Sequence, residues 1–205
     1  MQDYFAIQIN FVKWYNKLMK KTSKILDYLF ELGVMKRRRV SGFEQFTSAN
    51  HVTLAGHSYR AAILGMLLAE KEGCSAAKVG LMLLVHENGE TRIGDPDMIA
   101  TKAGIDKADA EKKAYKAQIS QLDKESRHLL YGLFKEKHQA NSLEAKVACD
   151  ADILEHIISA KEFVDQGNTG AQVWLDATYD WYADSAREIF RDIEHAHFTD
   201  WISRV

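Results

Sequence analysis

Hydrophobic residues recur at every third or fourth position along most of this chain, which is the spacing of helices that bury one face. The first such stretch covers residues 4–33 and ends at Gly33, where a glycine can close a helix. Later stretches predict helices over 51–72, 75–88, 106–121, 124–138, 141–165 and 170–196. The single proline, Pro96, leaves these helices uninterrupted. We therefore expect an all-α protein built as a helical bundle.

Two segments between the predicted helices differ from the rest in composition. Residues 91–97 contain Gly94 and Pro96, which predict a non-helical turn. Residues 36–39 are four consecutive cations that run from Lys36 to Arg39. Such a run is most often a solvated helix end, because the helix dipole favours positive charge there, and anion binding is the second interpretation.

Length and composition limit the number of domains. The chain has 205 residues, 46% of them hydrophobic, and its composition shows no break. This predicts one domain over residues 1–205, with an aromatic helical extension at 170–205. We expect the aromatic side chains of this extension to pack in the core or between subunits.

Charge and cysteine content bear on partners and compartment. A formal net charge of -2 and a pI near 6.4 give no electrostatic footprint for nucleic acid or for an anionic membrane. Two cysteines are too few for a disulfide framework. The chain starts without the basic and then apolar pattern of a leader, and it lacks a run of about eighteen apolar residues. We expect a cytoplasmic protein that binds neither nucleic acid nor a membrane.

Three short segments place imidazole and carboxylate groups on predicted helices. The side chains that could act as metal ligands are His57, His86, Glu87 and Asp152. Such groups suit a divalent ion such as Mn, Co, Mg, Fe or Zn, and three helices can hold them around one point. Adjacent residues diverge by about 100° on a helix, so His86 and Glu87 could contact one ion only from its side.

The same residues also have structural interpretations. His57 alone, at the start of an apolar helix, is more often a hydrogen-bonded core histidine. A carboxylate at a core face costs free energy unless a cation or hydrogen bonds satisfy it. We therefore expect Asp152 to point inward and Asp150 to lie behind the ligands or in solvent. Glu90 shares a face with His86 if that helix continues. The second histidine of the zinc-protease pattern His-Glu-x-x-His is absent, which excludes that activity.

In order and spacing, these motifs resemble the HD-domain superfamily of metal-dependent phosphohydrolases. Its pattern is a first His, a His-Asp pair and a later Asp. The resemblance spans about residues 25–165 and is closest to the five-prime deoxynucleotidase-like branch. Ala-Gly-His-Ser at 55–58 fills the place of the first motif, and His-Glu-x-x-Glu at 86–90 with Gly-Asp at 94–95 fills the second. Glu-Ala-Lys at 144–146 and Asp-Ala-Asp-Ile-Leu-Glu at 150–155 match the last one.

The resemblance implies a single-domain HD bundle with one divalent metal ion. Its metal ligands would be His57, His86, Glu87 and Asp152. It also implies that the protein hydrolyses a phosphomonoester, most simply a (deoxy)nucleoside 5'-monophosphate. A small phosphorylated substrate, a nucleotide, is the implied partner, and a homodimer is the implied assembly.

Three further residues receive roles by resemblance. Glu90 would orient or deprotonate the attacking water. Asp95 would lie beside the substrate phosphate or sugar. The phosphate-binding arginine of the family falls at Val40, so Arg39 takes this role if the loop shifts by one residue.

Several positions depart from the pattern and leave other functions open. Glu87 stands where the family has Asp, Val52 and Gly56 stand where this branch has Glu, and Phe43 replaces a Trp near the sugar. The second interpretation is a catalytically degenerate HD domain that binds a nucleotide or metal as a sensor or scaffold. A phosphodiesterase for cyclic nucleotides would need more histidines around a second metal than His51 supplies.

Overall fold

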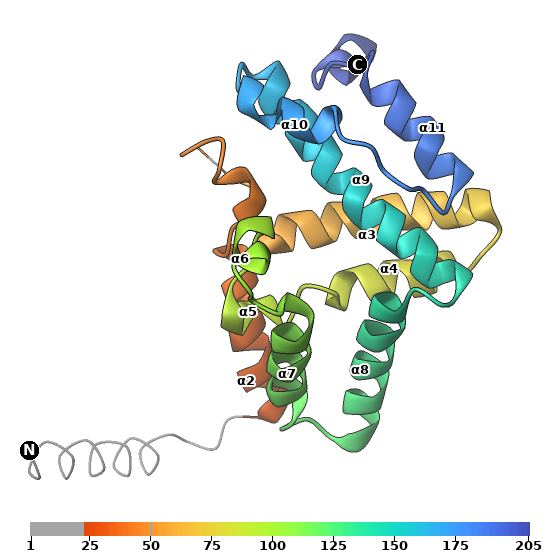
Figure 1. Cartoon of the computed structure of the whole chain (residues 1–205). Coiled ribbons are helices and arrows are strands. Elements are labelled where there is room, and N and C mark those ends of the chain that lie inside the picture. Colours follow the sequence, from red (N-terminus) through yellow and green to blue (C-terminus); the bar gives the residue numbers. More distant parts are fainter. Residues whose placement is uncertain (1–22, 50) are drawn as a thin grey trace, which may run out of the picture.

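The protein is all-α, as the hydrophobic spacing predicts, in a computed structural model that describes residues 23–49 and 51–205. The helices of the described residues are α2 (Lys24–Leu32), α3 (Leu54–Glu72), α4 (Ala76–Val85), α5 (Glu90–Ile93), α6 (Met98–Lys102), α7 (Lys107–Ile119), α8 (Lys124–Gln139), α9 (Leu143–Asp165), α10 (Gln172–Leu175) and α11 (Asp184–Ile193). Short 3-10 turns cover Gly33–Lys36, Ser41–Phe43, Thr169–Ala171 and Asp200–Arg204. Figure 1 shows their arrangement.

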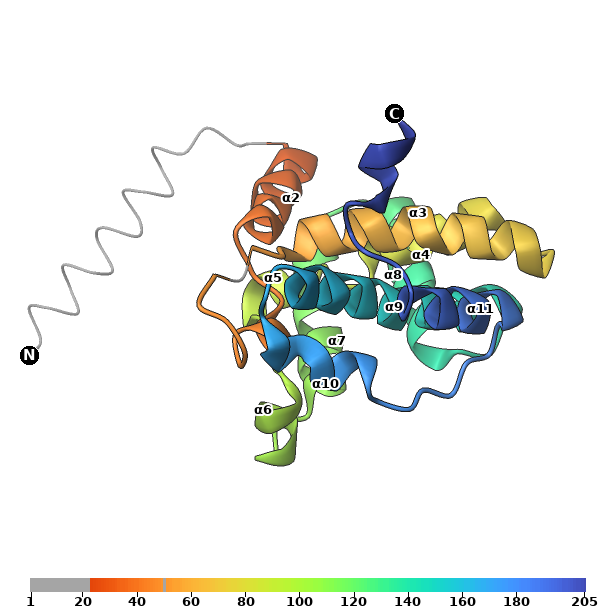
Figure 2. The same ribbon diagram turned by 90° about the horizontal axis from the view of Figure 1, so that it is seen from above.

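The centre of the bundle is formed by α3, α4 and α9 (Figures 1 and 2). Each begins at a residue whose side-chain oxygen accepts a hydrogen bond from the backbone N–H three residues later, namely Thr53, Ser75 and Ser142. Their facing side chains are buried, Leu68, Leu83 and Leu154 among them. Because the buried side chains of these helices pack against one another, residues on the three helices are held at fixed relative positions.

Smaller elements surround this centre. Helices α7 and α8 pack against each other and bury Tyr115 and Phe134, whose ring centroids are 4.7 Å apart. Helix α2 adds Tyr28 to the same cluster. Helix α6 projects from the body on the same side as α10 (Figure 2). No described helix combines the length and apolarity needed to cross a membrane.

Three predicted boundaries need correction or lie outside the described residues. The part of the first predicted helix before Ser23 lies outside them. The predicted turn at 91–97 starts only at Gly94, because α5 extends to Ile93. The predicted helix over 170–196 is wrong: a non-helical stretch separates α10 from α11 (Figure 2). In this stretch Ala183 donates its backbone N–H to buried Asp150 at 2.7 Å, a tertiary contact that sequence periodicity does not reveal.

Candidate metal centre

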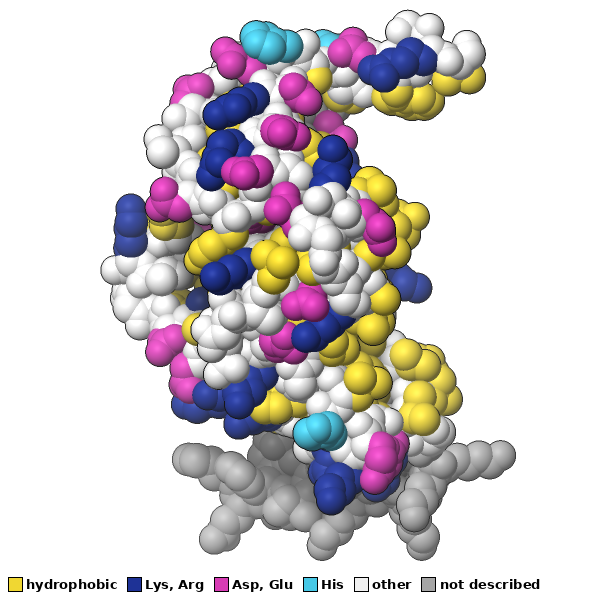
Figure 3. Space-filling view, turned by 90° about the vertical axis from the view of Figure 1, so that its right-hand side faces the viewer, with side chains coloured by type: hydrophobic (Ala, Val, Ile, Leu, Met, Phe, Trp, Pro, Cys, Tyr) yellow, Lys and Arg dark blue, Asp and Glu magenta, His cyan; other side chains and the backbone are white. Residues whose placement is uncertain are grey.

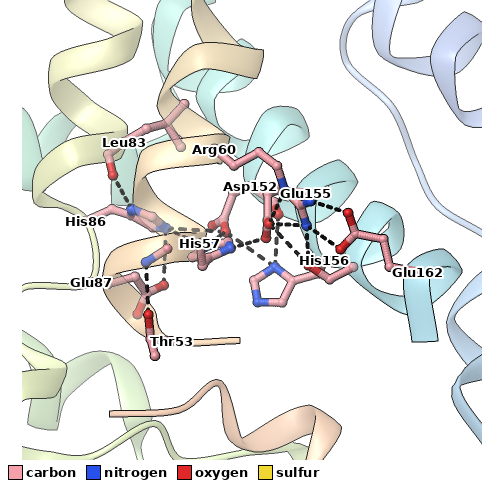
Figure 4. A network of polar contacts seen from close by, with 12 residues as sticks. Thr53, His57, Arg60, Leu83, His86, Glu87, Asp152, Glu155, His156 and Glu162 are labelled. Atoms are coloured by element: carbon pink, nitrogen blue, oxygen red, sulfur yellow. Dashed lines mark hydrogen bonds and ion pairs between the residues drawn. The ribbon is translucent and has the colours of Figure 1, made fainter. Parts of the chain in front are cut away.

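Four predicted ligands come together at the centre of the bundle (Figure 4). His57 lies in the first turns of α3, His86 and Glu87 directly follow α4, and Asp152 lies in α9. The His57 Nε2 atom is 3.3 Å from His86 Nε2 and 3.1 Å from Asp152 Oδ1. One ligand atom from each of the four residues lies within 4.8 Å of the others. We call these four residues the ligand cluster.

Helix ends explain how His57 and His86 reach the ligand cluster. The Thr53 side chain starts α3, so that His57 is fixed one turn into a helix whose first residue, Leu54, is buried. Helix α4 ends at Val85, and His86 follows as its cap residue with helical backbone angles. Its Nδ1 donates to the Leu83 carbonyl at 2.7 Å. His86 and Glu90 therefore belong to two consecutive helical segments and not to one continuous helix.

The side chains of Asp150 and Asp152 take opposite directions on α9. Asp152 points to the ligand cluster, as expected. Asp150 neither supports the ligands nor reaches solvent, because it is buried and accepts a hydrogen bond from the Ala183 backbone. Burial raises its pKa, while that hydrogen bond works in the opposite direction. This hydrogen bond to Asp150 thus holds the segment before α11 against α9.

A second layer of polar contacts orients His57. Its Nδ1 contacts Glu155 Oε2, and both side chains are almost wholly buried. Glu155 in turn accepts hydrogen bonds from Arg60 Nε at 2.8 Å and from Ser159 Oγ at 3.1 Å. Arg60 is also paired with Glu162 (Figure 4). A carboxylate on the second ring nitrogen is the usual support of a metal-binding histidine, since it fixes the tautomer and the ring orientation.

The donor set fits a divalent ion. The Nδ1 atoms of His57 and His86 are engaged with Glu155 and with the Leu83 carbonyl, which leaves both Nε2 atoms to face Asp152 Oδ1. Glu87 Oε1 is 3.2 Å from His86 Nε2. The Oε2 atom of Glu87 is buried and has no hydrogen-bond partner among the described residues. Two imidazoles and two carboxylates that converge in this way could hold one metal ion.

A buried lysine that the sequence pattern does not reveal neutralises part of the negative charge of the ligand cluster. Lys137 of α8 places its Nζ 2.5 Å from Asp152 Oδ2, so the two oxygens of Asp152 face different partners. Burial disfavours the ionised form of Asp152, but Lys137 and His86 hold its pKa well below the usual range. Burial likewise opposes a charge on His57, and its hydrogen bonds to Asp152 and Glu155 nevertheless raise its pKa to about 10. Lys137 gave no signal in the sequence because it lies in an ordinary lysine-rich helix.

Glu90 and Asp95 lie beside the ligand cluster and are joined by a second unpredicted lysine. Lys107, the first residue of α7, is 2.7 Å from Glu90 Oε1 and 2.8 Å from Asp95 Oδ1. Asp95 Oδ2 accepts a hydrogen bond from the Ser41 backbone N–H at 2.7 Å and a second one from its hydroxyl at 3.2 Å. Burial and the nearby Glu87 carboxylate raise the pKa of Glu90 well above its ordinary value.

An inner cavity borders the ligand cluster and is connected to an outer cavity through shared lining residues. The inner cavity has a volume of about 260 Å³ and is lined by His57, Glu87, Asp152, Asp95 and Lys107, together with Val40, Leu54, Ile153, His156, Trp174 and Tyr179. The outer cavity, about 860 Å³, shares six of these residues and continues between α6 and α10, where apolar side chains predominate. The cluster is therefore accessible to a ligand with a polar end and an apolar end.

The remaining predicted residues differ in whether they line the two cavities. Val40 lines both cavities, but Arg39 is exposed, pairs with Thr53 through its backbone, and lines neither of them. Phe43 is fully buried, and its ring is tilted against that of Trp174 with the centroids 5.5 Å apart.

The aromatic extension has two parts with different surroundings. Tyr179, Trp181 and Phe190 pack on the core as expected. Trp174 and Tyr179 also line the cavities. The expectation that this extension serves for packing alone is thus incomplete. Helical spacing could not reveal the second use, because the chain leaves the helix after Leu175.

Comparisons with known proteins identify the family of the chain. Residues 33–194 match the protein family described as HD domain. The chain is 29% identical over 144 residues to the human 5'-deoxynucleotidase HDDC2, which covers 69% of each chain. It is 28% identical to the HDDC2 of Dictyostelium discoideum, over 70% of this chain and 80% of that protein.

Solved structures show the same fold. A conserved hypothetical protein from Pyrococcus furiosus superposes with a TM-score of 0.70 at 27% identity, over 83% of this chain and 99% of the other. A predicted metal-dependent phosphohydrolase from Magnetospirillum magnetotacticum superposes with a TM-score of 0.64 at 19% identity, over 84% and 90% of the two chains. The family match covers well over half of the chain, and the motif resemblance found in the sequence is confirmed. The chain belongs to the HD-domain family.

Proposed function

We propose that this protein is a metal-dependent phosphohydrolase that cleaves the phosphate from a (deoxy)nucleoside 5'-monophosphate. The observation that carries the proposal is the inner cavity, in which three residues of the ligand cluster, an acidic side chain and a lysine line one space. Ligands for a metal, a cation for a phosphate and carboxylates for proton transfer are the groups that phosphomonoester hydrolysis requires. The names of the curated relatives, all 5'-deoxynucleotidases, support the enzyme class and the nucleotide substrate.

The metal ligands in this proposal are His57, His86, Glu87 and Asp152. They hold one divalent ion, for which Mn, Co, Mg, Fe and Zn are the candidates because mixed imidazole and carboxylate sites accept all of them. When bound, such an ion neutralises phosphate charge and lowers the pKa of water. Glu87 occupies the position of the family's aspartate, and its longer side chain still brings Oε1 to 3.2 Å from His86 Nε2.

The residues beside the ligand cluster provide proton transfer, phosphate binding and positioning. Glu90 orients the attacking water and takes its proton, because Lys107, 2.7 Å from its Oε1, and the positive charge of a bound divalent ion would favour the carboxylate against the effects of burial and Glu87. Lys107 supplies the positive charge that meets the phosphate oxygens, since it lines the inner cavity and Arg39 does not. Asp95 fixes both Lys107 and the loop at Ser41, and thereby shapes the place of the phosphate and sugar.

The outer cavity receives the leaving group. Its walls include Trp174 and Tyr179 on one side and Met98 and Ile99 of α6 on the other. A nucleoside is flat and largely apolar at its base, and aromatic side chains stack well on such a group. A nucleotide can therefore place its phosphate in the inner cavity and its base in the outer one.

Assembly and compartment complete the proposal. Large hydrophobic side chains are exposed on α2, α3 and α4, including Phe30, Ile63, Leu67, Leu81 and Leu84. Figure 3 shows hydrophobic side chains gathered along the right-hand edge of the molecule. An exposed apolar face of this kind favours a homodimer. A single domain over residues 1–205 and a cytoplasmic location are further parts of the proposal.

Phosphate release from a panel of nucleoside 5'-monophosphates, with and without each candidate ion, tests the proposal. We expect release that depends on an added ion and that is lost when the ion is chelated. Binding of a nucleotide or a metal without any phosphate release would instead identify the protein as a sensor or scaffold.

A further inference from the structure

His156 of α9 lies where the two cavities meet. It is one of the six residues that line both of them, with Val40, Asp95, Lys107, Trp174 and Tyr179. A 5'-nucleotide whose phosphate lies in the inner cavity and whose base lies in the outer one must place its sugar between these six residues. We therefore expect the group that contacts the sugar to belong to one of these six residues.

The ring of His156 is held in one orientation by its neighbours. Its centroid is 4.2 Å from that of the His57 ring. The Trp174 indole is stacked on it, with centroids 5.8 Å apart and an angle of 10° between the two ring planes. Phe43 stacks near it from a third direction, with centroids 6.2 Å apart. The His156 side chain remains 19% exposed, so a ligand in the cavities can reach it.

One ring nitrogen of His156 is bound to the protein and the other is free. The Nδ1 atom lies 2.9 Å from the Asp152 backbone carbonyl, and because a carbonyl only accepts, Nδ1 carries the proton. The Nε2 atom has no hydrogen-bond partner among the described residues and lies on the side of the ring away from Asp152 (Figure 4). In the neutral ring this Nε2 is a hydrogen-bond acceptor.

The other side chains shared by the two cavities that can accept a hydrogen bond are already engaged, and so is Lys107. Asp95 accepts hydrogen bonds from Ser41 and pairs with Lys107. Lys107 is divided between Asp95 and Glu90. The Tyr179 hydroxyl donates to the Trp174 carbonyl at 2.8 Å. His156 Nε2 is thus the acceptor that the protein itself leaves without a partner at this place.

We propose that His156 Nε2 accepts a hydrogen bond from a hydroxyl group of the substrate's sugar and so determines sugar specificity. The inference rests on the proposed function, since it takes a nucleotide as the ligand. The ligand chemistry is a hydroxyl donor on a ring between the phosphate and the base. His156 is not one of the residues predicted from the sequence, because a histidine on an apolar helix is most often a core residue.

The test compares three nucleotides with the same base: the ribonucleoside, 2'-deoxynucleoside and 2',3'-dideoxynucleoside 5'-monophosphates. In the wild-type protein, loss of the recognised hydroxyl should lower kcat/KM about tenfold, as expected for one hydrogen bond to an acceptor left unpaired. The step at which the loss occurs tells which hydroxyl is recognised. In His156→Phe, which keeps a flat ring against Trp174 but removes the acceptor, the three nucleotides should be used equally well.

Two further variants separate recognition from structural effects. His156→Gln keeps an acceptor and should retain a several-fold hydroxyl preference. His128→Phe makes the same change at an exposed site on α8 and should keep the full wild-type preference. If His156→Phe lowers the rate for all three nucleotides by one factor and still discriminates about tenfold, the proposal is wrong.

Dissociation constants of the three nucleotides, measured by calorimetry on the same variants, make the test independent of turnover. If no phosphate is released from any nucleotide, the proposed hydrolase function fails, but a hydroxyl preference in binding that disappears in His156→Phe would still support the role of His156. Equal dissociation constants in the wild-type protein, together with equal rates, would refute it.

Discussion

The two ends of the connected cavities are built in different ways. The ligand cluster stands on α3, α4 and α9, and its histidines are almost wholly buried and supported by contacts behind them. The opposite side, in the outer cavity, comes from short elements, α6, α10 and the first residue of α7, and its apolar side chains are exposed: Met98 is 68% exposed and Ile99 58%. The difference indicates that long helices fix the chemistry, whereas short segments meet the leaving group. Substitutions on the first side should abolish turnover, and those on the second should change substrate preference.

The largest effect is expected for Asp152→Ala. It removes a metal ligand and leaves Lys137 buried without its partner, so kcat/KM should fall about a thousandfold or more and bound metal should be lost. Phosphate release and metal content, with the melting temperature as a folding check, measure this. Asp150→Asn, on the opposite face of α9, is the matched control and should keep the metal. A variant that lacks Asp152 and retains both metal and turnover would contradict the assignment.

Glu90→Gln should separate chemistry from metal binding. Loss of the carboxylate that takes the proton should lower kcat by about 10²- to 10⁴-fold, while the metal stays bound because Glu90 is not a ligand. Turnover and metal stoichiometry of the same sample provide the measurement. Glu136→Gln removes a half-buried carboxylate of α8 that is paired with Lys78 and lines neither cavity, and it should keep most activity. Retention of full activity by Glu90→Gln would remove Glu90 from the mechanism.

Lys107→Met should weaken substrate binding. A hydrogen bond from a charged group is worth about 1.5–3 kcal/mol, so KM should rise about ten- to a hundredfold. Lys113→Met on the exposed face of α7 is the control. Arg39→Met, measured beside it, decides between the two cations, since a rise in KM only in the arginine variant would restore the role predicted from the sequence.

On the leaving-group side, Trp174→Ala should cost less and should act selectively. Stacking of a base on an aromatic ring is worth about 1–3 kcal/mol, so kcat/KM for nucleotides should fall about tenfold. For deoxyribose 5-phosphate, which has no base, the fall should be smaller, and metal binding should not change. Trp201→Ala removes an exposed tryptophan of the same extension as a control. Equal losses for both substrates would mean that Trp174 supports the fold and not the base.

A glycine pair tests how tightly the ligand side is packed. A Cβ on Gly65 of α3 would lie 2.3 Å from Leu83 of α4, so Gly65→Ala should lower the free energy of unfolding by about 1–3 kcal/mol. Gly132 of α8 has no atom near its Cβ position, and Gly132→Ala should raise that free energy by about 0.5–1 kcal/mol. Denaturant unfolding measures both. If Gly65→Ala is as stable as the wild type, α3 and α4 are not held as closely as described.

The contrast between the two sides also explains what the sequence could reveal. The fold class was predictable from hydrophobic spacing, and the convergence of His57, His86, Glu87 and Asp152 was predictable from the resemblance of their motifs to the HD superfamily. That these four and the residues beside them carry out the roles proposed here stays a prediction.

Other features of the site depend on tertiary contacts that local patterns do not encode. Lys107 and Lys137 look like ordinary surface lysines and become site residues only because α7 and α8 pack against the ligand cluster. The break in the predicted helix over 170–196 has the same origin, since Asp150 binds the Ala183 backbone from 33 residues away. Trp174 lines the cavities because α10 packs against α9, which is a further tertiary contact.

The most direct test of the central claim is the metal content of the purified protein, measured by elemental analysis on the same sample that is assayed for phosphate release from 5'-nucleotides. The account predicts one divalent ion per chain and turnover that disappears on chelation and returns when the ion is restored. Phosphate release that persists after complete removal of metal would contradict it, and so would a protein that binds neither an ion nor a nucleotide.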